Sequence, residues 1–464
     1  MEDVSTEAGS FRDRRGRIYY HGDRVLRSVM PIAVDDYYFV RSTGLVEQLV
    51  SDGKLIAETQ VDKQVLAATA SDAAIVLEHP KLPFISYPYE WCFSALKSSA
   101  LLHLDIQRAA LDRGVAMTDA SAYNVQFIGA RPVFIDHLSF RRYQDGEYWS
   151  GHRQFCEQFI NPLLLQSLAG VPHNAWYRGA LEGIPAEELR NLIPWRSRLS
   201  WNVFTNVFLQ ARLQTSSADA STAIEKAKAR RLPKIGFEQI LRGLRRWVSK
   251  LEPKPHGGSV WQDYSHDNSY AQEEASKKKQ FVADFASSVQ PQLILDIGCN
   301  TGDYSVVALD NGAALAVGFD FDFGALDYAF NRARRESLNF LPLYLDAANP
   351  SPNQGWSQAE RQGLSERAQG DAILALALIH HLAIARNIPL QQVIDWIVAM
   401  APQGVIEFVP KADRMVKRLL QMREDLFDYY EPTAFEAMLS SRARIAKSMQ
   451  ISSSGRTLYW FDRT

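Results

Sequence analysis

A glycine turn that follows a short apolar run is the part of this sequence best suited to hold a ligand. Residues 293–295 read as a strand buried inside a parallel sheet, and Asp296 stands where that strand should end. Gly298 and Gly302 frame the turn, which also contains Asn300, and a helical pattern follows. Glycine tolerates a positive φ and lets the backbone approach a bound molecule closely. The spacing, Asp-x-Gly-x-x-x-Gly, differs from the Gly-x-Gly-x-x-Gly of dinucleotide-binding proteins.

Two more acidic residues stand at the ends of predicted strands. Asp320 follows the apolar run 314–319, and Asp346 follows the run 340–345. An acid at the tip of the second strand is well placed to accept hydrogen bonds from both hydroxyls of a ribose. Strands and helical segments alternate through this half of the chain, which predicts a doubly wound α/β fold.

The next two predicted strands carry the candidates for acid–base chemistry. The run 371–379 leads into His380 and His381, and the run 404–409 contains Glu407. Histidine titrates near neutral pH, so either ring can act as a general base toward an acceptor hydroxyl. Glu407 is a second candidate base. The alternative is that the histidines cap the strand and line the pocket, and that Glu407 is a polar core residue.

This succession of glycine turn and strand-end acids resembles the class I S-adenosylmethionine-dependent methyltransferases, over about residues 260–464. The resemblance implies a Rossmann-like sheet of seven strands, with S-adenosylmethionine as the cofactor. It also implies that the turn holds the methionine end, the second-strand acid the ribose, and the third-strand acid the adenine amino group. An aromatic or basic residue before the turn often closes over the methionine end in this family. The implied cofactor-binding residues are Asp296, Gly298, Asn300, Gly302, Asp320, Asp346, Tyr270 and Lys279.

The loop after the third of these strands has a predicted role as well. Residues 347–355 are long enough to cover a cofactor. The indole of Trp356, which follows directly, can stack on adenine or fill the core.

The upstream half holds a second constellation of polar residues. A helical pattern at 101–111 is followed by a loop with Asp119 and Asn124, then by a hairpin pattern that ends at Asp136. This order resembles the catalytic segment of kinase-like phosphotransferases. There the first Asp orients the acceptor hydroxyl, and the Asn and the last Asp hold Mg²⁺ on the phosphates of ATP. The resemblance therefore implies a nucleotide and metal site at Asp119, Asn124 and Asp136.

The upstream half also departs from the kinase-like pattern. No histidine precedes Asp119 at the usual position, and His137 and Leu138 stand where Phe-Gly is usual. No glycine-rich phosphate loop lies near the N-terminus, and only Arg27 and Lys54 are candidates for the phosphate-binding cation. These departures favour a degenerate kinase-like domain. The alternative is that the three polar residues are turn and cap residues around a hairpin.

The amino-acid composition and one stretch rich in proline and glycine predict the domain organisation. The chain has 464 residues, of which 46% are hydrophobic and 22% charged, and its formal net charge is −2. These values are typical of a globular protein and give no global field that would favour nucleic acid or a membrane. A Pro/Gly-rich stretch at 253–259 predicts a linker. We expect an α+β domain at 1–252 and the methyltransferase domain at 260–464.

Residues 225–254 form a strongly basic stretch with apolar residues at helical spacing. Such a helix either packs on one domain with its charges in solvent, or binds an anionic membrane surface, an anionic glycan or RNA. The three cysteines are far apart, and the sequence has neither a signal-peptide pattern nor an apolar run of about 20 residues. These features predict a cytoplasmic protein without a transmembrane segment.

Together these features predict a methyltransferase that acts on a small-molecule or glycan-like acceptor, with O-methylation favoured. The end of the fourth strand lacks the Asn/Asp-Pro-Pro-Tyr/Phe signature of amino-group methylases, which argues against DNA N-methylation. The whole chain resembles a bacterial group of nodulation-type methyltransferases. Three other functions stay open: a bifunctional kinase–methyltransferase that uses ATP and Mg²⁺, a non-catalytic cofactor-binding scaffold, and RNA methylation through residues 225–254.

Overall fold

The chain folds into two compact units. The computed structural model describes residues 4–209, 211, 231–254, 269–421 and 424–464. The N-terminal unit comprises Met1–His256 and Asn353–Arg361, and the C-terminal unit comprises Gly257–Pro352 and Gln362–Thr464. The main division therefore falls within the stretch 253–259, whereas the short segment 353–361 was not expected to belong to the first unit.

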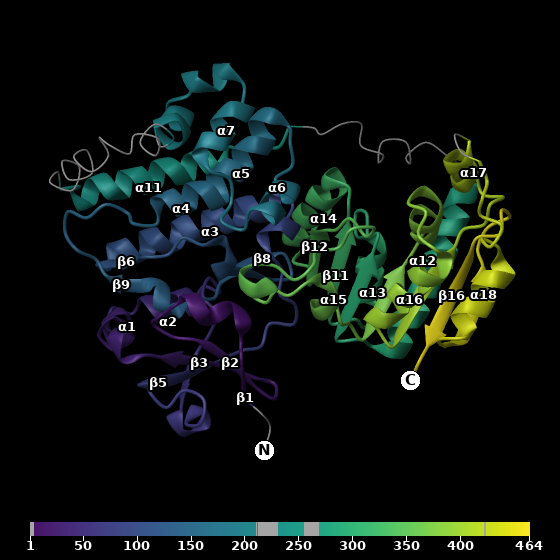
Figure 1. The fold of residues 1–464 in the computed structure, drawn as a ribbon, viewed down its shortest axis with the longest axis horizontal. Helices are drawn as coiled ribbons and strands as arrows, with labels where there is room; N and C mark the ends of the chain where they lie inside the picture. Colours follow the sequence, from purple (N-terminus) through teal and green to yellow (C-terminus); the bar gives the residue numbers. More distant parts are fainter. Residues whose placement is uncertain (1–3, 210, 212–230, 255–268, 422–423) are drawn as a thin grey trace. The chain divides into compact units, whose positions relative to one another are not determined.

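The C-terminal unit is built on a seven-stranded sheet with the order β12-β11-β10-β13-β14-β16-β15 (Figure 1). Its strands are β10 (Leu293–Ile297), β11 (Leu315–Asp320), β12 (Phe340–Tyr344), β13 (Ala372–Ala375), β14 (Gln403–Phe408), β15 (Arg444–Gln450) and β16 (Thr457–Asp462). β16 runs antiparallel to both of its neighbours, β14 and β15, and the other pairs are parallel. The predicted seven-stranded α/β sheet is confirmed, and it is mixed.

The strand order also fixes where a ligand can bind. From β10 the chain proceeds outward through β11 and β12, whereas β13 and β14 lie on the other side of β10. The strand order thus reverses between β10 and β13, and in open α/β sheets ligands bind beyond the carboxyl ends of the strands at such a point. The central strands β10 and β11 are buried along their whole length, as expected for strands covered on both faces.

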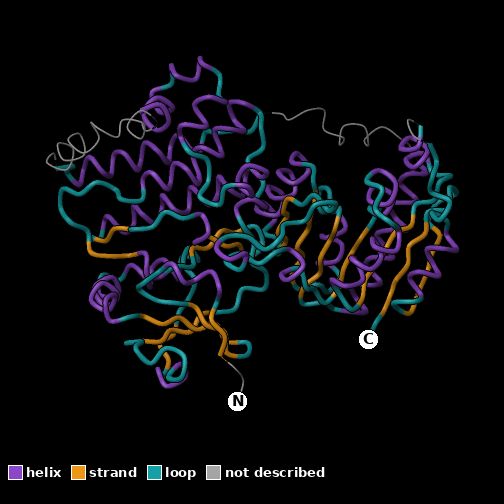
Figure 2. Tube along the Cα trace, in the orientation of Figure 1, coloured by secondary structure: helices purple, strands orange, loops and turns teal. Residues whose placement is uncertain are grey.

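Helices pack along this sheet (Figure 2). They are α12 (Ser269–Val289), α13 (Asp303–Asp310), α14 (Phe323–Glu336), α15 (Leu364–Arg367), α16 (Leu390–Met400), α17 (Arg414–Leu420) and α18 (Pro432–Ser440). The predicted strand at 371–379 ends earlier than expected. Ala377 has a φ of 50°, so the chain leaves the sheet before the histidines and enters a π-helical turn at His381–Ala385.

The N-terminal unit begins with a five-stranded antiparallel sheet in the order β1-β2-β3-β5-β4. The strands are β1 (Val4–Thr6), β2 (Ile18–His21), β3 (Arg24–Val29), β4 (Thr59–Val61) and β5 (Ile75–His79), and the helices α1 (Val34–Ser42) and α2 (Leu45–Ser51) lie between β3 and β4 in the chain.

The remainder of this unit is mainly helical around the buried helix α3 (Phe93–Asp112). Two short antiparallel pairs follow α3: β6 (Val115–Met117) with β9 (Phe140–Arg142), and β7 (Val125–Ile128) with β8 (Arg131–Phe134). The helices after them are α4 (His152–Phe155), α5 (Asn161–Leu164), α6 (Asn174–Gly179), α7 (Ala186–Leu192), α8 (Trp201–Val203) and α11 (Lys234–Ser249). In the described part of the chain, no helix has both the length and the apolarity needed to cross a membrane.

Helix α11 carries most of the described part of the basic stretch 225–254, of which residues 225–230 lie outside the described residues. It packs against α3 and buries Phe237, Leu241, Leu244 and Val248. Arg245 forms a bidentate pair with Asp105 of α3, with N–O distances of 2.5 and 3.0 Å. The apolar face of this helix is therefore engaged within its own unit.

Candidate active site

The glycine turn after β10 has the backbone conformation that the sequence predicts. Gly298 and Gly302 have φ of 84° and 79°, and Asn300 between them has a φ of 50°. A Cβ at Gly302 would stand 2.3 Å from the ring of Phe340, so only glycine fits there. A Cβ at Gly298 would meet no atom closer than 3.7 Å. Gly302 thus lets the turn pack on the sheet, and Gly298 is required by its positive φ and not by a close contact.

Two buried acids hold this turn in place. Asp296 accepts a hydrogen bond from Ser305 Oγ at 2.6 Å, and burial raises its pKa to about 7. Asp320 is 8% exposed and accepts from the backbone amides of Asn300 at 2.8 Å and Asp322 at 2.9 Å. Burial also raises the pKa of Asp320. The carboxylate of Asp320 therefore joins the tip of β11 to the glycine turn. Its described hydrogen bonds all come from backbone amides.

Asp346 lies just after β12 and is partly exposed. Its Oδ1 accepts from the amide of Ala348 at 3.1 Å, and its Oδ2 lies 3.6 Å from Arg386 Nη2. All three acids that the sequence placed at strand ends are thus found at the carboxyl edge of the sheet.

The two residues predicted to close over the cofactor have different outcomes. The side chain of Tyr270 lies outside the described residues, and Lys279 is exposed on α12. Its neighbour Lys278 is buried instead and places Nζ 5.5 Å from the ring centroid of Tyr304. Lys278 shares a helix face with Phe281 and Phe285, so the helical period of α12 was the signal that could have distinguished the two lysines.

The histidine pair follows β13, at the carboxyl edge of the sheet. The ring centroids of His380 and His381 are 4.2 Å apart. His380 is 1% exposed, and burial, together with the positive potential of His381 and Arg456, lowers its pKa to about 2. Burial and Arg456 also lower the pKa of His381, which is only partly buried. Both rings are therefore neutral near pH 7, and the low pKa makes His380 a weak base.

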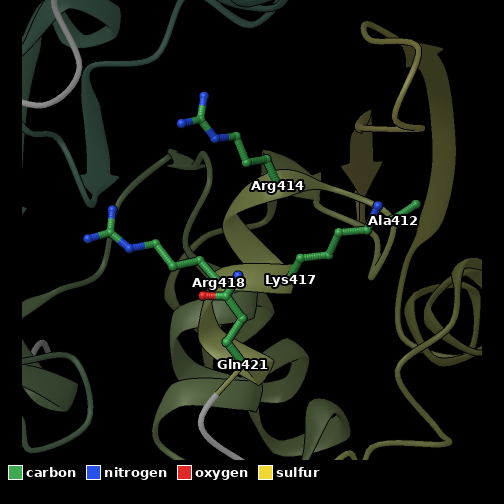
Figure 3. Close-up of a pocket in the computed structure, with 5 residues that line it drawn as sticks. All are labelled: Ala412, Arg414, Lys417, Arg418 and Gln421. Atoms are coloured by element: carbon green, nitrogen blue, oxygen red, sulfur yellow. The ribbon is translucent and has the colours of Figure 1, made fainter.

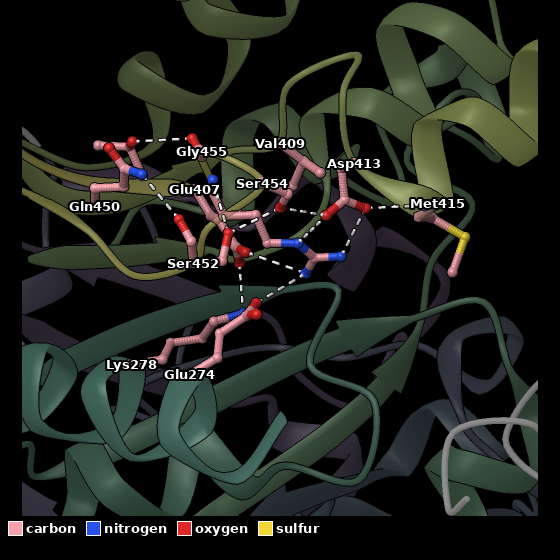
Figure 4. A network of polar contacts seen from close by, with 12 residues as sticks. Glu274, Lys278, Glu407, Val409, Asp413, Met415, Gln450, Ser452, Ser454 and Gly455 are labelled. Carbon is pink, nitrogen blue, oxygen red and sulfur yellow. Dashed lines mark hydrogen bonds and ion pairs between the residues drawn. The ribbon is translucent and has the colours of Figure 1, made fainter. Parts of the chain in front are cut away.

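Glu407 on β14 belongs to a buried ionic network (Figure 4). It is 0% exposed, and its Oε2 accepts from Lys278 Nζ at 2.7 Å. Arg456 Nη1 lies 3.5 Å from Glu407 Oε1 and 3.4 Å from Glu274 Oε1. The same guanidinium binds Asp413 through Nε at 2.8 Å and Nη2 at 3.0 Å.

This network comprises residues that sequence reasoning did not select, namely Glu274, Lys278, Asp413 and Arg456. They come from three separate segments, because Glu274 and Lys278 lie one turn apart on α12, whereas Asp413 precedes α17 and Arg456 precedes β16. The network pairs Glu407 with two cations, Lys278 and Arg456.

The polar residues of the N-terminal unit also come together. Asn124 Nδ2 donates to Asp119 Oδ2 at 3.0 Å, and Arg27 Nη1 donates to Asp136 Oδ1 at 2.7 Å. Burial raises the pKa of Asp119, and the charge of Asp136 adds to this effect. Burial alone would raise the pKa of Asp136, but Arg27 and the hydrogen bond from Ser139 outweigh it, so that this pKa is lowered. Within the described residues, no group of three or more His, Cys, Asp or Glu side chains could hold a metal ion.

The segment 353–361 packs as part of the N-terminal unit. Glu360 is 4% exposed and accepts from Arg12 Nε at 2.7 Å and Nη2 at 2.9 Å. The guanidinium of Arg361 lies 4.4 Å from the ring centroid of Tyr123. A bidentate pair and a cation–π contact therefore hold this segment on the unit.

These contacts correct the sequence interpretation of Trp356. The core-filling interpretation is wrong, because the indole is 72% exposed. The last three residues of the predicted cofactor-covering loop, 353–355, belong to the N-terminal unit, and stacking of Trp356 on adenine stays a prediction.

Comparison of the sequence with known proteins gives a relative that matches nearly the whole chain. No family model matches the sequence. The chain is 48% identical over 458 residues to nodulation protein NoeA of Rhizobium meliloti (strain 1021), which covers 98% of this chain and 96% of that protein. A ribosomal protein L11 methyltransferase of Shewanella amazonensis (strain ATCC BAA-1098 / SB2B) is 41% identical over 59 residues, 12% of this chain and 20% of that protein.

Two solved structures are similar over part of the chain. Magnesium protoporphyrin IX methyltransferase (ChlM) from Synechocystis PCC 6803, with bound SAH, has a TM-score of 0.32 and 16% identity and covers 44% of this chain and 93% of that chain. N-methyltransferase NodS from Bradyrhizobium japonicum WM9, in complex with S-adenosyl-L-homocysteine, has a TM-score of 0.32 and 16% identity and covers 44% and 92%.

Proposed function

The chain belongs to the family of nodulation protein NoeA, and we propose that it is an S-adenosylmethionine-dependent methyltransferase for a small-molecule or glycan-like acceptor. Cofactor binding is assigned to the carboxyl edge of the C-terminal sheet, and proton transfer to the histidine pair. The N-terminal domain, residues 1–252, is assigned as an accessory domain of kinase-like descent.

The observation that carries this proposal is the setting of Asp320. Its buried carboxylate stands at the tip of β11, beside the glycine turn that follows β10. The described residues give Asp320 backbone donors and no ion pair, so its charge is available to the hydroxyls of a ribose. Asp346, one strand further out, is assigned to the adenine amino group from its place after β12, although it also lies near Arg386.

When bound, the cofactor supplies a methyl group on a positively charged sulfur, which is transferred by in-line displacement. The chain's own contribution is to orient the two reactants and to remove a proton from the acceptor. His381 is the more accessible of the two histidines, whereas the pKa of about 2 makes the buried His380 a weak base. Glu407 is held by Lys278 and Arg456, so we assign the base role to His381, with His380 packed beside it, and favour a hydroxyl as the acceptor.

The three polar residues that the kinase-like resemblance implies as a nucleotide and metal site form hydrogen bonds and an ion pair within the N-terminal domain. Arg27 and Ser139 engage Asp136, and Asn124 engages Asp119. We therefore propose that this domain does not transfer phosphate, and the same experiment tests the bifunctional alternative.

The test is isothermal titration calorimetry with the full chain. S-adenosylmethionine is titrated into wild-type protein, Asp320→Ala, Asp320→Asn and Asp310→Asn, a control at an exposed position on α13. Two hydrogen bonds to a charged acceptor are worth about 1.5–3 kcal/mol each, so Asp320→Ala should lose about 100-fold or more in affinity. Asp320→Asn should lose less affinity for S-adenosylmethionine, and Asp310→Asn should bind it as tightly as the wild type.

Full binding by folded Asp320→Ala, or no binding by folded wild-type protein, would contradict the proposal. ATP with Mg²⁺ is then titrated into the same wild-type sample, and no heat of binding is expected. Magnesium-dependent ATP binding that Asp136→Ala abolishes would instead establish the bifunctional enzyme.

A further inference from the structure

A group of exposed apolar side chains follows helix α7 in the N-terminal unit, among residues to which no role is assigned above. They lie on the end of α7 and on three short turns that contact one another, near the top of Figure 1: η9 (Trp195–Leu199), α8 and η10 (Phe204–Phe208). Leu199 is 82% exposed and Trp201 75%. The rings of Trp201 and Phe204 stack with their centroids 6.2 Å apart. We name five exposed residues the α8 patch: Leu192, Trp195, Leu199, Trp201 and Phe204.

The patch is not core that lacks its cover, because the inner side of the same segment is already packed. Val203 and Val207 are buried, and η10 packs against α7. Asn206 is also buried, and its Oδ1 lies 3.1 Å from Nε2 of His152 on α4. The segment is therefore held to its own unit while its large apolar side chains remain in solvent. Such side chains gathered on a protein surface mark a site of interaction.

The charge around the patch is entirely positive in the sequence. From Leu189 to Ala218 the chain contains four arginines and no acidic residue. Arg196 and Arg198 are exposed, and no ion pair within the described residues involves either of them. Their guanidinium groups lie over aromatic rings, 5.7 Å from the centroid of Trp195 and 4.8 Å from that of Phe208. A guanidinium in this position keeps the N–H groups at its edge for an oxyanion.

A membrane surface offers a partner for each kind of side chain in this segment. Tryptophan rings lie at the level of the lipid headgroups, aliphatic side chains reach the acyl boundary, and arginines pair with anionic headgroups. A nucleic acid would offer phosphates to the arginines but no apolar counterpart to Leu192 and Leu199. A protein partner would need pockets of complementary shape, whereas the fluid boundary of a lipid layer needs none.

We propose that the α8 patch docks the N-terminal unit on a membrane surface that contains anionic phospholipids. Trp195, Leu199 and Trp201 enter the layer between headgroups and acyl chains, and Arg196 and Arg198 bind headgroup phosphates. This surface is separate from helix α11, whose apolar face is engaged within its own unit. The inference does not depend on the proposed methyltransferase function, because docking needs neither the cofactor nor a methyl acceptor.

A hollow beside α17 provides a matched control for the effect of charge. It is lined by Ala412, Arg414, Lys417, Arg418 and Gln421, so that no large apolar side chain accompanies its cations. Figure 3 shows the side chains of Lys417 and Arg418 extending to different sides of the helix. Both are exposed, as Arg196 and Arg198 are. Removing either pair changes the net charge of the chain by the same amount.

The probes are vesicles of phosphatidylcholine alone and vesicles of phosphatidylcholine and phosphatidylglycerol in equal parts, titrated into the full chain and followed by flotation. The wild type should bind the anionic vesicles saturably, more weakly as salt is added, and the neutral vesicles much less. Arg196→Gln/Arg198→Gln should bind the anionic vesicles at least about tenfold more weakly. Leu199→Gln/Trp201→Gln should lose at least about as much, since two apolar side chains no longer enter the lipid. Lys417→Gln/Arg418→Gln should bind like the wild type.

Three results would overturn the proposal. The first is no saturable binding of the wild type to anionic vesicles, and the second is an equal loss in Lys417→Gln/Arg418→Gln, which would show only an effect of net charge. The third is undiminished binding by Leu199→Gln/Trp201→Gln, which would show attraction to phosphates without insertion. Light scattering without lipid tests the other occupant: a dimer that Leu199→Gln/Trp201→Gln dissociates would show that a second copy covers the patch instead. Urea unfolding of each variant confirms that these exposed substitutions leave the fold intact.

Discussion

Both units contain buried acids at a potential ligand site. The two sets of acids differ in whether a cation of the chain pairs with them. Asp320 in the C-terminal unit is contacted by backbone amides, and burial raises its pKa. Asp136 in the N-terminal unit faces Arg27 at 2.7 Å and receives a hydrogen bond from Ser139, and its pKa is lowered. The first carboxylate has no cation beside it among the described residues, whereas the second is already paired with Arg27.

This difference separates residues that bind from residues that stabilise. A buried carboxylate with a cation of its own contributes to the fold through that pair, and removing the cation leaves an uncompensated charge. Glu407 belongs to this class as well, although it lies close to the proposed active site. The comparison can be tested by removing each cation in turn.

The largest effect is expected at Lys278. Lys278→Met leaves the fully buried Glu407 without its closest cation and should destabilise the C-terminal unit by about 3 kcal/mol or more. Lys279→Met, one position further on the exposed side of α12, should change stability by less than about 0.5 kcal/mol. Urea unfolding of the full chain, followed through the transition of this unit, measures both. Similar losses for the two variants would show that Glu407 does not depend on Lys278.

A smaller loss of stability is expected at Arg27. Arg27→Met removes the cation from Asp136, whose side chain is 14% exposed, and should cost about 2 kcal/mol in the N-terminal unit. Adding Asp136→Asn should restore part of that loss because both charges are then absent. Lys54→Met, which breaks the more exposed pair with Asp52, is the control and should stay within about 1 kcal/mol. S-adenosylmethionine binding should be unchanged in all three. A variant at Arg27 that keeps full stability would remove the distinction between the two acids.

The smallest effect is a shift in the titration of the histidine pair. Since the folded pKa of His380 is about 2 and that of His381 is also lowered, both rings should stay neutral well below pH 6.5 in the wild type. The unfolded chain binds more protons below its ordinary histidine pKa of about 6.5, so the pair should reduce stability as the pH falls below that value.

NMR of isotope-labelled histidine measures the titration directly. Arg456→Gln should move both pKa values upward, because a cation that disfavours the protonated rings is lost and Asp413 and Glu407 are left without it. Arg456→Lys, which keeps the charge, should shift them less. Unchanged titration in Arg456→Gln would show that burial alone keeps the rings neutral.

Much of the C-terminal unit was predictable because its signals are local. Buried parallel strands appear as short apolar runs, and the glycines of the turn after β10 have the positive φ that favours glycine. Asp296, Asp320 and Asp346 were found from their place directly after such runs. The strand at 371–379 was predicted too long, because the apolar run continues past the point where Ala377 turns the chain out of the sheet.

The remainder of the site has no local signal. Lys278, Asp413 and Arg456 meet Glu407 only because the strand order brings α12, the start of α17 and the start of β16 to one edge of the sheet. The segment 353–361 gave no sign in its composition that it packs with the first unit, since its contacts with Arg12 and Tyr123 span more than two hundred residues of sequence.

The sequence by itself thus determined the strands, the glycine turn after β10 and the acids that stand at strand ends, because each depends on residues within one short segment. Only the tertiary structure decided which of those acids are paired with a cation of the chain. Charge balance depends on cations brought from distant segments: Arg27 neutralises Asp136, Lys278 neutralises Glu407, and the described residues provide no such cation for Asp320.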